Sequence, residues 1–261
     1  MLHFMLGSLV LLGQPLILQN PDTLVTPSTG LPGGVAEAVA RAAELDGGIW
    51  GIGVIDLRGG ENVTRNLSRR FRLDIPSLPL AAMGIELSNS GELPLDSMIG
   101  RNERFWERLH WAQQGGRGMC AAAIWSIRET RIAEWLGAEG FTGTVINGVY
   151  LDTPIPYEPD PNYITVDDAM GFLEIVYRNI ENRNARRIGD NPPLSQANRE
   201  TLGTSNLLYG WLDETGSSRH IFLMVRKPSG EDYGIVILTE NLCCPGKADL
   251  ALSIIWDSLK N

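Results

Sequence analysis

The chain has 261 residues, of which 43% are hydrophobic and 20% are charged, and this composition is typical of a globular protein with a large core. Its formal net charge of -9 at pH 7 excludes the strongly basic footprint that displaces counterions from phosphate, so we expect neither nucleic acid nor an anionic membrane surface as a partner. The expected organisation is one domain, or one core with an inserted subdomain.

The first element in chain order is the apolar segment Met1–Leu18, which carries no acidic or basic side chain. It resembles the hydrophobic region of a secretory signal, although a basic flank and a clear A-x-A cleavage site are missing. It is short for a transmembrane helix and is interrupted by Gly13 and Pro15. Two alternatives stay open: an export signal or membrane tether of a secreted, periplasmic or membrane-associated protein, and an apolar lead-in that packs on the domain of a cytoplasmic protein.

The folded domain is predicted to begin near residue 35, because residues 19–34 are rich in Pro, Gly and Thr and are typical of a linker. Val35–Leu45 is rich in Ala and has apolar residues at helical spacing, which predicts an amphipathic helix. The β-branched run Ile49–Leu57 and the polar segment Glu61–Asn66 are separated by turn residues and predict a β-hairpin.

The middle third, about residues 100 to 190, lacks strand signals and follows an apolar helix that is expected from about Pro76. Arg128–Leu136 places apolar residues on one helical stripe, and Thr165–Arg178 begins with a Thr cap and an acidic first turn. The Pro-rich segment Asp152–Pro161 lies between them and predicts a long loop. This third is therefore predicted to be an all-helical subdomain.

Strand signals return near the C-terminus, where apolar runs alternate with turn sequences and a last apolar helix follows. The predicted strands are Tyr209–Leu212, Arg219–Val225 and Tyr233–Leu238, and the predicted helix is Ala248–Leu259. Strands from both ends of the chain then pair in one antiparallel sheet. The predicted domain covers residues 35–261, with an α/β part at 35–72 and 200–261, a helical part at 73–199, and the N-terminal segment and linker at 1–34.

The three cysteines are Cys120, Cys243 and Cys244. An odd count with one adjacent pair does not define a disulfide framework, and the spacing is not that of a zinc site. We therefore expect no metal site, and the sequence offers no motif from which we expect a cofactor.

Lysine is rare in this chain and occurs only at positions 227, 247 and 260. The residues three positions before these lysines are Met224, Cys244 and Asp257, so the sequence contains no S-x-x-K motif. Arginine cannot replace lysine as a base, because its guanidinium stays protonated in proteins. A Ser-Lys catalytic dyad of this spacing is therefore excluded.

Phe71–Met83 reads FRLDIPSLPLAAM and resembles the active-site segment of serine β-lactamases and penicillin-binding proteins, which reads roughly F-x-x-x-S-x-x-K-L-P-L. Alignment on the shared Leu-Pro-Leu puts Asp74 in place of the nucleophilic Ser and Ser77 in place of the Lys. Ser88–Met98 also resembles the loop that follows this helix in the family. The resemblance implies an α/β (α+β) fold of the β-lactamase/transpeptidase type: an antiparallel five-stranded sheet, flanked by terminal helices, with an inserted all-helical subdomain.

The resemblance also assigns the other catalytic positions, and the reactive side chains of the family are missing from them. The S-D-N motif aligns with Gln114-Gly115-Gly116, the deacylating Glu of class A enzymes falls near Tyr150, and K-T-G aligns with Leu208-Tyr209-Gly210. Arg219-His220 resembles an R-H pair on the next strand. Arg219 and Ser77 are therefore candidates for binding a ligand, and Asp74 is more simply explained as an N-terminal helix cap.

These observations predict a pseudoenzyme: a β-lactamase-like scaffold with a binding or structural role for an unknown small molecule or protein partner, at the cell envelope if the N-terminal segment directs export. An active serine hydrolase with relocated groups, using Ser77, is the first alternative. The second is a subunit whose missing groups come from a partner.

Overall fold

The computed structural model describes residues 30–45, 47–99, 102–149, 151, 159–180, 183–189, 194–203 and 207–260. The interpretations of Met1–Leu18 as a signal, tether or lead-in lie outside these residues. The aligned position Tyr150 also lies outside them. Within the described ranges, no helix is both long and apolar enough to cross a membrane.

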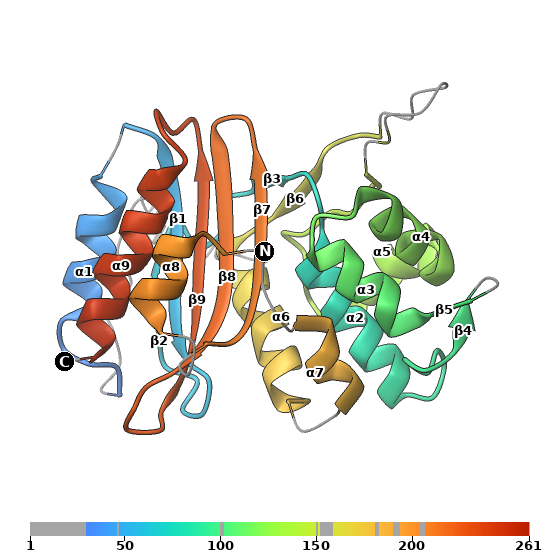
Figure 1. Cartoon of the computed structure of the whole chain (residues 1–261). Coiled ribbons are helices and arrows are strands. Elements are labelled where there is room, and N and C mark those ends of the chain that lie inside the picture. The colour runs from blue at the N-terminus through green and yellow to red at the C-terminus, as the bar shows by residue number, and fades with distance from the viewer. Residues whose placement is uncertain are drawn as a thin grey trace, which may run out of the picture.

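The centre of the molecule is a five-stranded sheet in the order β2-β1-β9-β8-β7, and every neighbouring pair is antiparallel (Figure 1). The strands are β1 (Ile49–Asp56), β2 (Asn62–Arg65), β7 (Leu207–Thr215), β8 (Ser218–Arg226) and β9 (Asp232–Glu240). Strands from the two ends of the chain meet where β1 pairs with β9. The predicted antiparallel five-stranded sheet is therefore confirmed.

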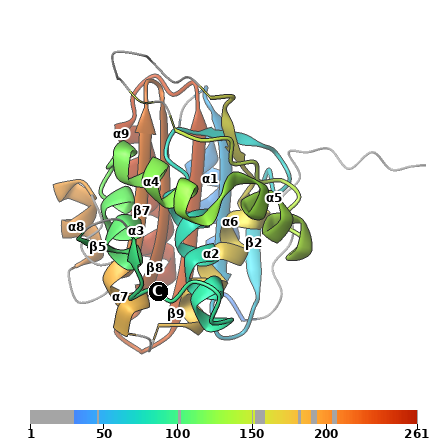
Figure 2. The ribbon, with the colours of Figure 1, turned by 90° about the vertical axis from the view of Figure 1, so that its right-hand side faces the viewer.

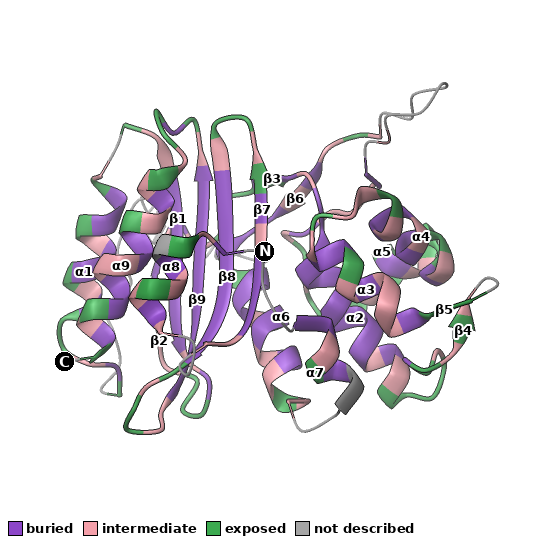
Figure 3. Ribbon diagram, in the orientation of Figure 1, coloured by how far each residue is buried: buried purple, intermediate pink, exposed green. Residues whose placement is uncertain are grey.

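One face of the sheet is covered by α1 (Val35–Ala43) and α9 (Gly246–Lys260), with α8 (Gln196–Leu202) beside α9 (Figure 1). Alternate strand residues such as Ile52 and Ile237 pack there with Trp256 in a continuous apolar cluster. The predicted flanking by terminal helices is confirmed. The strands are buried on both faces, which explains why they read as uninterrupted apolar runs (Figure 3).

The other face carries the helical part of the chain, which Figure 2 views with the sheet behind it. Its helices are α2 (Ser77–Asn89), α3 (Phe105–Gln113), α4 (Arg117–Ile127), α5 (Glu129–Ala138), α6 (Val166–Arg178) and α7 (Arg183–Gly189). The apolar helix α2 is buried along most of its length and lies in the core of this layer. The predicted cap of α6 is also observed, because the backbone N–H of Asp168 donates to the Thr165 hydroxyl at 3.2 Å.

Glycines on β1 allow the helical layer to approach the sheet closely. A Cβ atom at Gly51 would lie 2.5 Å from the Phe71 ring, and one at Gly53 would lie 2.7 Å from Val166 at the start of α6. Both glycines face the helical layer because side chains two positions apart on a strand share one face. The contact between β1 and α6 therefore depends on the missing side chains.

Two short antiparallel ladders were not predicted from the sequence. One joins β3 (Phe71–Leu73) to β6 (Asn162–Ile164), and the other joins β4 (Met98–Ile99) to β5 (Glu103–Arg104). The expectation that the middle third lacks strands is therefore wrong for β5 and β6. Segments of two or three residues are too short to show the alternation that marks a strand.

Candidate functional site

A pocket of about 260 Å³ opens between the β3–α2 connection, the start of α4 and the end of β7. We call it the Asp74 pocket. Its polar lining comes from Arg72, Asp74, Arg117, Asp160, Asn162 and Thr215. Leu73, Gly148, Pro159 and Pro161 complete the wall. Asp74, the position aligned with the nucleophilic Ser of the family, lines this pocket.

Asp74 is held by an ion pair and not by a helix end. Its carboxylate accepts a hydrogen bond from Arg117, the first residue of α4, and its side chain is 18% exposed. Helix α2 begins at Ser77 after Pro76, and no side chain caps its N-terminus. The alternative that Asp74 caps this helix is therefore wrong. The helix begins close to the expected Pro76, and Asp74 lies two residues before its N-cap.

Asp213 on β7 lies beside the pocket and, like Arg117, is not among the site residues predicted from the sequence. The residue is 3% exposed, and its carboxylate accepts hydrogen bonds from the backbone N–H of Asp74 at 2.8 Å and of Ile75 at 3.2 Å. Burial raises the pKa of Asp213 to about 7, against the lowering effect of these two bonds. One signal could have found it: a carboxylate two positions after Trp211 must share that residue's buried face of the strand.

His220 lies beside this network but has no free nitrogen. The backbone N–H of Thr239 donates to Nδ1 at 3.1 Å, so Nε2 carries the proton and donates to the carbonyl of Arg72 at 2.7 Å. Complete burial lowers the pKa of His220 to about 4, so the ring is neutral at physiological pH. The histidine joins β8, β9 and β3, which is a structural role.

Ser77 lies at the first position of α2 and is 4% exposed. Its backbone N–H donates to the carbonyl of Ile75 at 2.8 Å. Among the described residues, those that line the Asp74 pocket do not include Ser77. The structure therefore does not bring the Ser77 hydroxyl to the same pocket as Asp74.

The positions aligned with S-D-N form the tight turn between α3 and α4. Gly115 has a φ of 85°, and a Cβ at Gly116 would lie 2.6 Å from the carbonyl oxygen of Trp111. The side chain of Gln114 donates to that of Gln113 at 2.8 Å. These residues therefore make the turn that places Arg117 at the pocket.

The positions aligned with K-T-G lie toward the start of β7, away from the pocket. Gln113 donates to the carbonyl of Gly210 at 2.5 Å, and the ring of Tyr209 packs beside Trp211. Five residues of extended strand separate Gly210 from Thr215, which is about 17 Å. Thr215, at the end of β7, lines the pocket instead.

Leu208 and Arg219 contribute nothing to the lining of the pocket within the described residues. Leu208 is a partly buried residue at the edge of the helical core. Arg219 points to the opposite face of the sheet, where it pairs with Glu214 at 3.0 Å and with Asp249 of α9 at 3.2 Å. Its side chain is 10% exposed. Arg219, which was a predicted ligand-binding residue, therefore forms ion pairs on the α9 face of the sheet and does not face the pocket.

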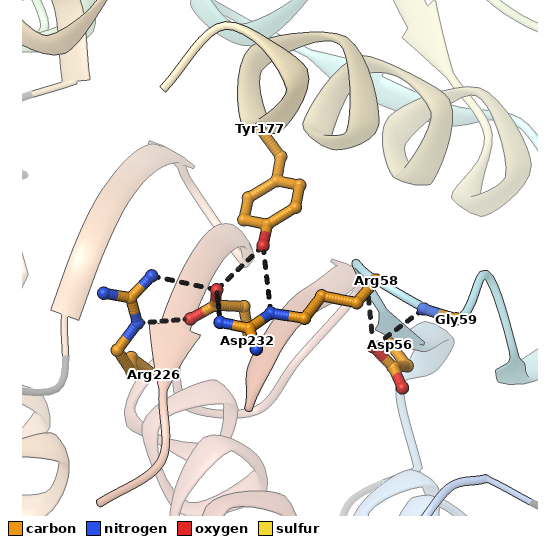
Figure 4. Close-up of polar contacts among 6 residues, drawn as sticks. All are labelled: Asp56, Arg58, Gly59, Tyr177, Arg226 and Asp232. Atoms are coloured by element: carbon orange, nitrogen blue, oxygen red, sulfur yellow. Dashed lines mark hydrogen bonds and ion pairs between the residues drawn. The ribbon is translucent and has the colours of Figure 1, made fainter. Parts of the chain in front are cut away.

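A second polar cluster lies at the other end of the sheet (Figure 4). The fully buried carboxylate of Asp232 accepts bonds from Arg226 at 2.6 and 2.9 Å, from Arg58 at 3.0 Å and from the hydroxyl of Tyr177 at 2.8 Å. Burial opposes ionisation, but the bonds from these three side chains lower the pKa of Asp232. The cluster ties the β8–β9 hairpin to the β1–β2 turn and to α6.

No group of three or more His, Cys, Asp or Glu side chains suited to a metal ion occurs in the described part of the chain. Cys120 is buried in α4, and burial raises the pKa of its thiol. This thiol is therefore protonated and has the character of an inert core residue.

Neither a protein-family model nor a curated protein matches the sequence. Solved structures do match. A β-lactamase from Chitinophaga pinensis has a TM-score of 0.70 at 14% identity, with 86% of this chain and 99% of that chain covered. A β-lactamase from Sphaerobacter thermophilus has a TM-score of 0.67 at 16% identity and coverages of 86% and 94%. An ancestral class A β-lactamase has a TM-score of 0.68 at 13% identity and coverages of 86% and 96%.

Identities this low establish the fold alone. The expected fold is confirmed: an antiparallel five-stranded sheet with terminal helices on one face and a helical insertion, which also carries the short ladders of β5 and β6. The chain has the fold of the class A β-lactamases.

Proposed function

We propose that the chain is a catalytically degenerate protein of the β-lactamase fold, a pseudoenzyme that binds a small molecule or a protein group at the Asp74 pocket. The observation that carries this proposal is the absence of S-x-x-K from the whole sequence. A serine hydroxyl is a weak nucleophile without a base beside it, and the reaction of this fold uses a lysine one helical turn away.

The groups near the pocket do not replace that base. Arg117 stays protonated and is paired with Asp74. Both nitrogens of the His220 ring are hydrogen-bonded, and its burial keeps it neutral. A carboxylate such as Asp74 could attack an acyl group only by forming an anhydride, which is a poor substitute for a serine ester.

The backbone at the start of α2 is also occupied. A reacting carbonyl is stabilised by N–H donors that point at the developing oxyanion. The N–H groups of Asp74 and Ile75 already donate to the buried carboxylate of Asp213. An oxyanion at this place would have to displace a carboxylate that is fixed by the sheet.

What the pocket offers is recognition without bond cleavage. Arg72 and Arg117 supply cationic donors, Asp74 and Asp160 supply acceptors, and Asn162 and Thr215 supply neutral polar groups. A polar ligand can be held by such a set. A cell-envelope location belongs to this proposal and rests on the apolar segment Met1–Leu18.

The proposal is tested by incubating the protein with a fluorescent penicillin and separating it under denaturing conditions. We expect no fluorescent band, while a serine β-lactamase of the same fold, used as a positive control, is labelled. Heat-denatured protein controls for non-specific attachment. A covalent adduct that survives denaturation would overturn the proposal.

The second candidate is an active serine hydrolase that uses Ser77, which the position of this residue at the first turn of α2 favours. Its test is turnover of nitrocefin by the wild type, by Ser77→Ala and by the matched variant Ser258→Ala in α9. Turnover that is lost only in Ser77→Ala would establish this candidate. We expect no turnover above buffer in all three proteins.

A further inference from the structure

The Asp213 carboxylate lies where two walls of the Asp74 pocket meet. One wall is the end of β7, where Thr215 follows two residues later, and the other is the connection between β3 and α2. The bonds that Asp213 accepts from the N–H groups of Asp74 and Ile75 join these walls directly. Asp213 is 3% exposed as a residue, so water cannot readily replace either bond.

The groups that face Asp213 come from every element packed around it. Asp74 on the β3–α2 connection raises its pKa, and Arg117 on α4 lowers it. Burial, and to a lesser extent the carboxylates of Asp213 and Asp74, raise the pKa of the Cys120 thiol on α4, so this thiol stays protonated. His220 is the register partner of Asp213 on β8 and is neutral. The hydrogen bonds described for Asp213 come from backbone amides, which do not titrate.

A carboxylate and a carboxylic acid differ in what they can accept. An ionised carboxylate has two acceptor oxygens, one for each of the two N–H groups. A protonated one has an O–H that donates and one carbonyl oxygen that accepts well. Uptake of one proton from water therefore leaves one of the two backbone N–H groups without its acceptor.

We propose that Asp213 is a proton-operated latch between β7 and the start of α2, closed by two hydrogen bonds when ionised and half-released when protonated. Release loosens the Asp74–Ile75 backbone, which is a wall of the Asp74 pocket. Burial places the pKa of this group at about 7, so the change falls close to neutrality. The latch does not require that the pocket take a ligand, and it therefore stands apart from the proposed function.

The test is amide hydrogen exchange of Asp74 and Ile75, followed by NMR at about pH 5.5 and about pH 8.5 and corrected for the intrinsic pH dependence of exchange. We expect protection of at least one of these amides to fall roughly tenfold at the lower pH, the factor that the loss of one hydrogen bond gives. The ¹³C shift of the Asp213 carboxyl should titrate over the same range.

Two variants sharpen the result. Asp213→Asn keeps one carbonyl acceptor and does not ionise, so its protection at Asp74 and Ile75 should be low and independent of pH. Asp168→Asn is the matched control, because burial also raises the pKa of Asp168 but its carboxylate bonds Thr144. It should keep the wild-type profile at Asp74 and Ile75.

Equal protection of both amides at the two pH values in the wild type would overturn the latch. A carboxyl titration of Asp213 below about pH 5 would do so as well. Both measurements use the wild-type chain, so they decide the proposal even if Asp213→Asn does not fold. Neither result depends on penicillin labelling or nitrocefin turnover.

Discussion

The two buried aspartates of the sheet, Asp213 at the pocket end and Asp232 at the other, differ in what surrounds them. Asp232 is fully buried, but two guanidinium groups and a tyrosine hydroxyl bond its oxygens, and its pKa is lowered. Asp213 is almost as buried, yet its bonds come from two neutral backbone amides, and its pKa rises to about 7. Burial penalises both charges, and the charge of the partners decides whether the carboxylate stays ionised.

The comparison also indicates that the Asp232 end of the sheet is held by stronger interactions than the Asp213 end. The partners of Asp232 come from β8, from the β1–β2 turn and from α6, and their charges outnumber that of the carboxylate. Asp213 instead accepts hydrogen bonds from two neutral backbone N–H groups, and these bonds hold a backbone segment beside the pocket. We therefore expect substitutions at the two ends to differ in size and in their dependence on pH.

The largest effect is expected for Asp232→Ala. The variant removes the carboxylate that accepts from Arg58, Arg226 and Tyr177, and it leaves the two guanidinium groups close to each other without their shared anion. Water can solvate the two unpaired guanidinium groups, because both are about half exposed, and this keeps the cost at the low end for a broken buried pair. We therefore expect a loss of roughly 3 kcal/mol in the free energy of unfolding. Urea denaturation measures this.

The control for that variant is Asp257→Ala, which breaks an exposed i,i+3 pair with Lys260. Its cost should stay within about 0.5 kcal/mol. A similar cost for both variants would remove the distinction between the buried and the exposed carboxylate.

The second-largest effect is expected for Asp213→Asn, and it concerns how the free energy of unfolding changes with pH. A carboxyl group whose pKa is raised in the folded state stabilises it fully below the unfolded value, near pH 4, and this contribution is lost as the pH rises through about 7. The asparagine variant lacks this loss. We therefore expect the free energy of unfolding of the wild type, relative to the variant, to fall between about pH 4 and pH 8.

Asp232 should behave in the opposite sense. Its pKa is lowered, so its contribution is present above about pH 4 and is lost as the pH falls through the folded value. Urea titrations of both aspartate-to-asparagine variants across this range measure the two trends together. Parallel curves for the two variants would contradict the comparison.

The smallest effect is expected for Tyr177→Phe. Removal of the hydroxyl takes one bond from Asp232 and the long 3.4 Å bond from Arg58 Nε, but both arginines keep their bonds to Asp232. The cost should be about 1 kcal/mol in the free energy of unfolding. A loss as large as that of Asp232→Ala would mean that the tyrosine, and not the arginines, holds the carboxylate.

Much of the fold was predictable because it depends on local patterns. The β-branched run that became β1, the three apolar runs that became β7, β8 and β9, and the Thr-capped α6 were each legible in a short window of sequence. The short β3–β6 ladder was not, because its pairing joins Phe71 to Ile164 across the helical insertion.

The pocket was only partly predictable. Asp74 was found because it lies in the FRLDIPSLPLAAM segment, whose resemblance carried the fold. Asp213 and Arg117 were missed because their meeting with Asp74 depends on how α4 and β7 pack. Arg219 was placed at a binding site by alignment, but strand alternation turns it toward α9, opposite to its neighbour His220.

The pairing of β1 with β9 has a consequence for how the protein is made. β1 lies between β2 and β9, so the edge that pairs with β9 stays open until the helical part, β7 and β8 have been synthesised and β9 follows. Such distant pairing slows folding and leaves the growing chain with an exposed strand edge. Loss of the last segment, β9 and α9, would uncover Ile52 and Val54 and make a truncated product prone to aggregation. β1 thus depends for its protection on β9 and α9, which follow it only after the helical part of the chain.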